Sequence, residues 1–217
     1  MDKHLVLQQV ATFVKEKLMG EGTGHDWYHI DRVRQLSLYI AQKEKANLFV
    51  VELGALLHDI SDWKFNGGDL NESANIADKL LRSLDVLPKD IQSVCNIINE
   101  VSFKGAGVED KPSSLETMIV QDADRLDAIG AIGIARTFAY GGSIKQPIHD
   151  PEFTPKLHSS FEEYKNEKTS TISHFYEKLL LLKDRLHTKV GKEIGEQRHQ
   201  YMLEFLERFY QEWEGKA

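Results

Sequence analysis

Residues 53–62 read LGALLHDISD, an apolar helical stretch that ends in the adjacent pair His58-Asp59. Imidazole nitrogens and carboxylate oxygens are common ligands of Zn, Mn, Fe and Ni. Two further candidates lie far away in the sequence: His29, and an Asp within residues 120–126, VQDADRL. Each candidate falls in a stretch that we predict to be helical. If these helices converge, they form a metal site in an α-helical core.

His29 is expected to point toward that core. It follows a predicted N-cap, Asp26, and it shares one helix face with Val33 and Ile40. A single histidine on an apolar face is more often a satisfied core residue than a ligand. Burial of His29 together with carboxylates would cost several kcal/mol for each group left without a partner, and a divalent cation would supply that partner.

Spacing does not choose between Asp122 and Asp124 as the fourth candidate. The two side chains point to nearly opposite faces of a helix. Asp122 lies in a stripe with Ile119 and Leu126, and the opposite face that carries Asp124 is apolar in part as well. The alternative for Asp122 is a structural carboxylate that is held by hydrogen bonds.

The chain is predicted to be helical throughout, because no stretch alternates convincingly between apolar and polar residues as a strand would. Ser113 and Glu116 predict a capping box for a helix that runs to about Ala139. Residues 140–158 contain two Gly and three Pro and predict an irregular loop. Two helices, the first through residues 174–186, are expected to complete the chain.

We therefore predict an all-α fold built as a single domain. Residues 1–139 would form a metal-binding helical core, and residues 140–217 would add the loop and the C-terminal helices that complete it. Phe209 and Trp213, close to the end of the sequence, could cover a core or meet a second copy in a homodimer.

Composition narrows the class of function. The 217 residues are 41% hydrophobic, and 27 basic against 34 acidic residues give a formal net charge of −7. This acidic balance argues against a general nucleic-acid or membrane-surface protein. The single cysteine, Cys95, excludes an internal disulfide and fits a reducing compartment. The longest apolar run, residues 128–135, falls far short of the roughly 20 residues that span a bilayer. We expect a cytoplasmic protein with neither a nucleic-acid nor a membrane partner.

The order of the four candidates resembles that of the HD superfamily of metal-dependent phosphohydrolases. The segments that carry the resemblance are similar to bacterial HD hydrolases typified by a nucleotide pyrophosphohydrolase. They are GHDWYHIDRV (24–33), LGALLHDISD (53–62), VQDADRLDAIGAIGIAR (120–136), HFYEKLLLLKDRL (174–186) and EIGEQRHQYMLEFLERF (193–209). The resemblance covers nearly the whole chain and implies an HD-domain helical bundle with a C-terminal helical extension.

The resemblance also implies roles for the candidate residues. The ligands would be His29, His58, Asp59 and Asp124, because the family's last ligand lies in the Ala-Asp-Arg-Leu segment. They would hold one divalent ion, of Mn, Fe, Ni, Co or Zn, with Mg also admitted. Asp59 would take part in catalysis, and an acidic residue at the position of Asp62 is linked in related members to orienting the attacking water.

Phosphate groups of the substrate require cationic or hydrogen-bonding partners. The candidates for these contacts are His25, Lys64, His174, Lys178, Lys183 and Arg198. Taken singly, each of these cations is expected more often as a solvated surface charge, and His25 as a loop hydrogen-bonding residue.

The expected function is a metal-dependent phosphohydrolase that uses metal-bound water to release pyrophosphate from nucleoside or deoxynucleoside triphosphates. Within the same class, a nucleotide monophosphatase or a phosphodiesterase is the alternative. From another class, the alternative is a non-catalytic helical module that binds a metal for structure or sensing.

Overall fold

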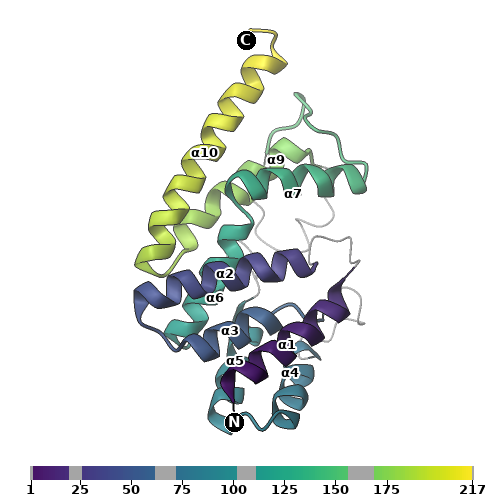
Figure 1. Cartoon of the computed structure of the whole chain (residues 1–217). Coiled ribbons are helices and arrows are strands. Elements are labelled where there is room, and N and C mark those ends of the chain that lie inside the picture. Colours follow the sequence, from purple (N-terminus) through teal and green to yellow (C-terminus); the bar gives the residue numbers. More distant parts are fainter. Residues whose placement is uncertain (1, 20–25, 62–71, 102–110, 156–168, 217) are drawn as a thin grey trace. The chain divides into compact units, whose positions relative to one another are not determined.

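The structure is a computed structural model and describes residues 2–19, 26–61, 72–101, 111–155 and 169–216. Every regular element among these residues is a helix, so the predicted all-α fold is confirmed (Figure 1). Among the described residues the chain divides into two compact units, the first extending to Asp124 and the second continuing from Arg125. The predicted union of residues 1–139 and 140–217 in one domain stays a prediction.

The first unit begins with two helices whose starts are fixed by side chains. Asp26 caps α2 by accepting a hydrogen bond from the backbone N–H of His29, as the sequence predicts, and Asn47 caps α3 in the same way. The helices of this unit are α1 (Lys3–Leu18), α2 (Trp27–Glu44), α3 (Leu48–Leu57), α4 (Glu72–Ser83), α5 (Pro88–Val101) and the larger part of α6 (Leu115–Asp127).

Helix α3 lies at the centre of the first unit. It contacts α1, α2 and α5, and all of its residues except Leu48 and Glu52 are buried. A helix that is apolar on every side needs neighbours on every side. Glu52 is compensated by Arg34 of α2, whose Nε donates to its carboxylate at 2.8 Å. The C-terminal end of α3, which carries His58, is therefore held by packing from several directions.

The second unit contains the end of α6 and the remaining helices. They are α7 (Gly130–Ser143), α9 (Thr171–Glu177), the 3₁₀ helix η1 (Leu179–Arg185) and α10 (Lys189–Trp213). Helix α10 contacts α7 and η1, and α9 contacts α7 and η1.

The long helix predicted to reach Ala139 is broken in the structure. Helix α6 ends at Asp127, and α7 starts at Gly130, whose φ of 75° lies in the left-handed region that ends a helix. The predicted capping box is also wrong. Ser114, not Ser113, accepts the hydrogen bond from Thr117 N, and Glu116 instead accepts from the backbone N–H of Asn47.

The helix predicted through residues 174–186 is two elements. Helix α9 ends at Glu177. Lys178, with φ −142° and ψ −58°, leaves the helical conformation before η1 begins. Leu179 and Leu182 are nevertheless both buried, because a spacing of three residues lies on one face of a 3₁₀ helix as it does on an α-helix.

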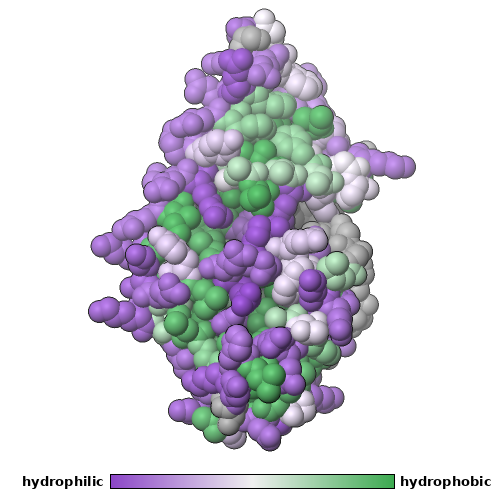
Figure 2. Space-filling model, in the orientation of Figure 1, coloured by the Kyte–Doolittle hydropathy of each residue, from purple (hydrophilic) through white to green (hydrophobic). Residues whose placement is uncertain are grey.

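Surface features of the second unit bear on the predicted partners. Trp213 is half exposed, but its ring lies 4.9 Å from that of His149 and 5.8 Å from that of Phe209, so it covers residues of its own chain. Figure 2 shows hydrophobic areas between hydrophilic side chains on the face that it draws. A homodimer stays a prediction.

Each helix in the described part of the chain is too short or too polar to qualify as a membrane span.

Candidate metal centre

The first turn of α2 places His29 inside the first unit. Its side chain is 1% exposed, and it lies on the same face as the buried residues Val33 and Ile40. The hydrogen bond from its backbone N–H to Asp26 measures 2.9 Å and fixes the start of the helix. The inward orientation inferred from helical phase is therefore correct.

The end of α3 presents His58 with one ring nitrogen already held by the backbone. Its Nδ1 lies 2.8 Å from the carbonyl oxygen of Ala55. A carbonyl can only accept, so Nδ1 carries a hydrogen, and in the neutral tautomer with this hydrogen Nε2 keeps its lone pair. Nε2 is buried and has no hydrogen-bond partner in the described part of the chain. This is the arrangement in which a backbone carbonyl orients a metal-binding imidazole.

Two carboxylates face the two imidazoles. Nε2 of His29 lies 3.5 Å from an oxygen of Asp124 and 3.9 Å from one of Asp59. Nε2 of His58 lies 3.9 Å from Asp124 and 4.0 Å from Asp59. The structure thus brings together all four residues expected from the sequence, and His29, His58 and Asp59 each offer a ligand atom within 4.8 Å of the others.

The structure separates the two aspartates that spacing could not distinguish. Asp122 is fully buried, whereas the side chain of Asp124 is 31% exposed and approaches both imidazoles. Geometry therefore favours Asp124 as the fourth member, in agreement with what the family resemblance implies.

The cluster fits a divalent metal ion. Distances of 3.5–4.0 Å between the facing atoms are too long for good hydrogen bonds. Two donors about 2.1 Å from a shared ion would be about 3.4 Å apart at the tetrahedral angle and farther apart at wider angles. Two imidazoles and two carboxylates suit Mn, Fe, Co, Ni or Zn. A cation would also satisfy the buried Nε2 atom of His58, which otherwise lacks a hydrogen bond among the described residues.

Comparison with known proteins identifies the family. The HD domain model matches residues 26–129, which contain the entire cluster. The Bacillus subtilis protein YpgQ is 39% identical over 200 residues, covering 92% of this chain and 89% of its own. The chain belongs to the HD domain family. HD domains bind divalent metal ions, and the cluster around His58 is where such an ion fits this one.

Solved structures extend the match to the whole length. A Lactobacillus plantarum protein has a TM-score of 0.83 and 33% identity over 99% of this chain and 100% of its own. An HD-superfamily hydrolase from Bacillus thuringiensis has a TM-score of 0.76 and 38% identity over 98% of each chain. A crystal structure of YpgQ in complex with ADP has a TM-score of 0.77 and 33% identity over 98% of this chain and 97% of its own. These HD relatives support a metal-dependent hydrolase in general.

The residues expected to contact substrate are only partly described. His25, Asp62 and Lys64 lie outside the described residues. His174, Lys178, Lys183 and Arg198 all belong to the second unit. Burial, and next the nearby Lys178, lower the pKa of His174 to about 3, so its imidazole is neutral near pH 7. It can donate a hydrogen bond to a phosphate but adds no charge.

Two of the three cations in this set, Lys183 and Arg198, have contacts within the second unit. Lys183 forms ion pairs with Asp184 at 3.3 Å and Glu196 at 3.4 Å, which raise its pKa. Arg198 donates from Nη1 to the carbonyl oxygen of Leu126, and burial lowers its pKa. Their contact with substrate stays a prediction.

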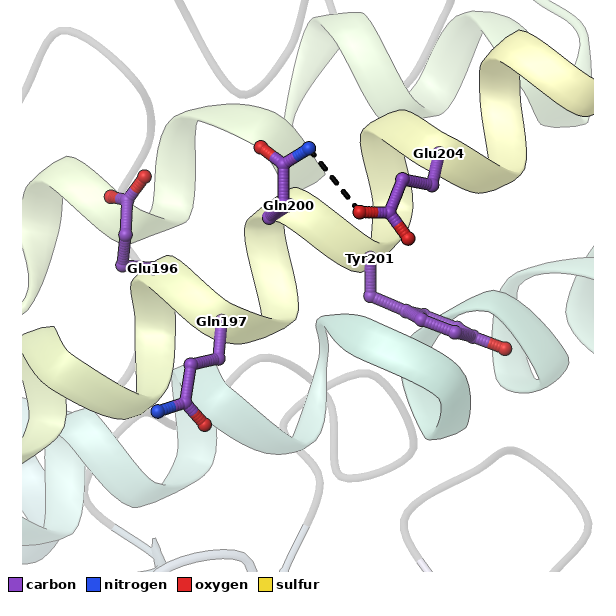
Figure 3. Close-up of a pocket in the computed structure, with 5 residues that line it drawn as sticks. All are labelled: Glu196, Gln197, Gln200, Tyr201 and Glu204. Carbon is purple, nitrogen blue, oxygen red and sulfur yellow. Dashed lines mark hydrogen bonds between the residues drawn. The ribbon is translucent and has the colours of Figure 1, made fainter.

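A hollow in the surface of α10 is a poor candidate for a phosphate site. It is lined by Glu196, Gln197, Gln200, Tyr201 and Glu204 (Figure 3). These side chains come from one helix, two of them are carboxylates, and none is cationic. Gln200 already donates a hydrogen bond to Glu204 at 3.3 Å. An anionic substrate would meet repulsion here.

The turn between α6 and α7 contains polar residues that the sequence analysis did not single out. Asp127, which is 3% exposed, pairs with Arg136 at 2.6 Å. Gly130, three residues after Asp127, is the sequence feature that indicates the end of α6. Charged groups near a helix end commonly interact with it, so this glycine also points to Asp127.

Proposed function

We propose that this protein is a metal-dependent phosphohydrolase that releases pyrophosphate from nucleoside or deoxynucleoside triphosphates. The observation that carries the proposal is the facing arrangement of two imidazoles and two carboxylates in the first unit. The ADP complex of YpgQ supports a nucleotide as the substrate class. Manganese is the first metal to test, because the ligand set admits it and it occupies hydrated, oxygen-rich sites readily.

Each residue has a distinct part in this proposal. His29 and His58 would hold the ion through ring nitrogens, and Asp59 and Asp124 would offset its charge. A bound divalent cation would lower the pKa of a water molecule and polarise a phosphate oxygen. Asp62 would orient the attacking water, and Asp59 would take part in catalysis as well as in holding the ion. His25, Lys64, His174, Lys178 and Lys183 are the proposed contacts to substrate; Arg198, the sixth candidate from the sequence, is given a different role below.

The cluster leaves room for catalysis rather than structure alone. The carboxylates of Asp59 and Asp124 are 24% and 31% exposed, whereas the imidazoles that face them are buried. A structural metal site is normally closed by its protein ligands. Partial exposure on the carboxylate side supports an open site that water and a phosphate could reach.

The test is a turnover assay on metal-stripped protein to which Mn²⁺, Co²⁺, Ni²⁺, Zn²⁺ or Mg²⁺ is added back. Phosphorus NMR of reactions with nucleoside triphosphates should show pyrophosphate and a nucleoside monophosphate. Orthophosphate would indicate a phosphatase, and cleavage of bis-ester substrates a phosphodiesterase. Metal binding without turnover of any of these substrates would leave the non-catalytic module as the function. Asp124→Asn should lose turnover at every metal tested.

A further inference from the structure

The last turn of α6 accepts a hydrogen bond from an arginine side chain of α10, that of Arg198. The carbonyl oxygen of Leu126 accepts a backbone hydrogen bond from Ile129 at 3.2 Å and a second from Nη1 of Arg198. The final carbonyls of a helix have no partner within it. Arg198 therefore satisfies and holds a group that would otherwise depend on solvent or on one weak turn bond.

Close backbone approach fixes Arg198 in this position. A Cβ atom added to Gly130 would lie only 3.0 Å from Cγ and 3.1 Å from Cβ of Arg198. One turn earlier on α10, a Cβ atom on Gly195 would lie 2.2 Å from Leu186 and 3.7 Å from Leu126. Gly130 thus allows the turn that follows α6 to lie directly against Arg198, and Gly195 allows α10 to approach Leu186. The aliphatic part of the Arg198 side chain therefore has little freedom.

Charge also favours this contact. The C-terminal end of a helix carries partial negative charge, and a guanidinium there is stabilising. Asp127, the last residue of α6, also attracts Arg198, which opposes the effect of burial on its pKa. Arg198 is thus held at the end of α6 by a directed hydrogen bond and by electrostatic attraction.

Leu126, whose carbonyl oxygen accepts this hydrogen bond, is two residues beyond Asp124 on the same helix. At about 1.5 Å of rise per residue, the two Cα atoms are separated by about 3 Å along the axis. His29 and His58 have side chains that are 1% and 2% exposed, so packing holds them. The side chain of Asp124 is 31% exposed and depends more on the backbone of α6 for its placement.

We propose that Arg198 is a positioning residue for the metal centre: it holds the last turn of α6 and thereby the carboxylate of Asp124. The inference rests on Asp124 being a ligand, as in the proposed function. It differs from the prediction that Arg198 contacts substrate, because it assigns the effect of the residue to metal binding in the absence of any nucleotide.

The experiment is calorimetric titration of metal-stripped protein with Mn²⁺ and no nucleotide. Removal of residues that orient metal ligands weakens metal binding by about 10–100-fold, and we expect Arg198→Ala to fall in this range. Arg198→Lys keeps the charge but loses the planar donor, so it should recover part of the affinity. Arg208→Ala is the matched control, because Arg208 lies on the same helix, is exposed and pairs with Glu212; it should bind Mn²⁺ as the wild type does.

Wild-type Mn²⁺ affinity in folded Arg198→Ala would overturn the inference. If Arg198→Ala does not fold, Arg198→Lys decides in the same assay, and unchanged affinity there also overturns it. Turnover is measured separately at saturating Mn²⁺. The positioning role predicts an unchanged KM for nucleotide under that condition, whereas a raised KM with unchanged metal affinity would show a direct substrate contact. If no variant or wild type turns over nucleotide, the proposed function fails, but the affinity comparison still tests the role of Arg198.

Discussion

Nδ1 of His58 lies 2.8 Å from the carbonyl oxygen of Ala55, three residues earlier in the chain. This contact fixes which nitrogen carries hydrogen and directs the lone pair of Nε2 toward Asp59 and Asp124. The imidazole is thus prepared for a cation by its own helix. Without a cation, the buried Nε2 atom has no hydrogen bond among the described residues.

Metal binding should therefore stabilise the folded protein. Ligand at 100 times its Kd adds about 2.7 kcal/mol to the free energy of unfolding, so Mn²⁺ should raise the melting temperature of metal-stripped wild type. We expect His58→Ala to abolish this rise. His4→Ala removes an exposed histidine of α1 and should keep the full response in differential scanning fluorimetry. A full metal-dependent rise in His58→Ala would contradict the assignment.

Paired substitutions separate the roles of the two aspartates in α6. Asp124→Asn removes a negatively charged carboxylate that faces both imidazoles. We therefore expect the affinity for Mn²⁺ to fall at least about 100-fold, while the stability of the metal-free protein changes little. Asp122→Asn alters a fully buried carboxylate and should instead lower the free energy of unfolding by about 1–3 kcal/mol. Titration calorimetry and urea denaturation measure the two effects. The reverse pattern would make Asp122 the ligand.

Local sequence rules predicted the part of the site that depends on local structure. Asp26 and Asn47 cap their helices as their residue types favour, and helical phase placed His29 inward. The choice of Asp124 over Asp122 could not be made in this way, because α6 is buried on both faces and only the position of the neighbouring imidazoles distinguishes them.

Where the predicted elements differ from the structure, tertiary contacts are the cause. The sequence predicts Ser113 as the cap of α6, but the backbone N–H of Ser113 donates to Glu100 at 2.8 Å, and the neighbouring Ser114 caps the helix. The Ala and Ile residues around Gly130 suit a helix, so local sequence does not predict the break there. The left-handed conformation of Gly130 is supported by Arg198, which is far away in sequence.

Close packing of α3 on α5 gives a stability prediction. A Cβ atom on Gly54 would lie 2.8 Å from Cδ1 of Ile97. Gly54→Ala should therefore be costlier in the wild type than in an Ile97→Val background, which lacks that methyl group. We expect a coupling free energy of about 1 kcal/mol from a double-mutant cycle in urea denaturation.

The control for this cycle is Gly142→Ala in α7. Nothing lies within 4 Å of a Cβ atom added to Gly142, so alanine should raise stability by up to about 1 kcal/mol through helix propensity. Zero coupling between Gly54→Ala and Ile97→Val would show that α3 and α5 do not pack at the distance that the structure gives.

His174 should make stability depend on pH below neutrality. Its ordinary pKa is 6.5, and burial, with the charge of Lys178, lowers the folded-state value to about 3. Between these values the unfolded chain binds a proton at this residue that the folded chain does not. Stability should therefore fall as pH decreases from about 6.5 toward 3, by up to about 1.4 kcal/mol for each pH unit. Above about pH 7.5 the residue is neutral in both states and contributes no pH dependence.

His174→Gln isolates this contribution, because glutamine does not titrate. Urea denaturation from pH 8 to pH 4 should give a flatter loss of stability for the variant than for the wild type, with the two curves parallel above about pH 7.5. Other groups titrate in the same interval, and His199 has a pKa that is lowered too, chiefly by burial, so the difference between the two curves is the relevant measurement. Parallel curves across the whole range would mean that the folded protein accepts a proton at His174 as readily as the unfolded chain does.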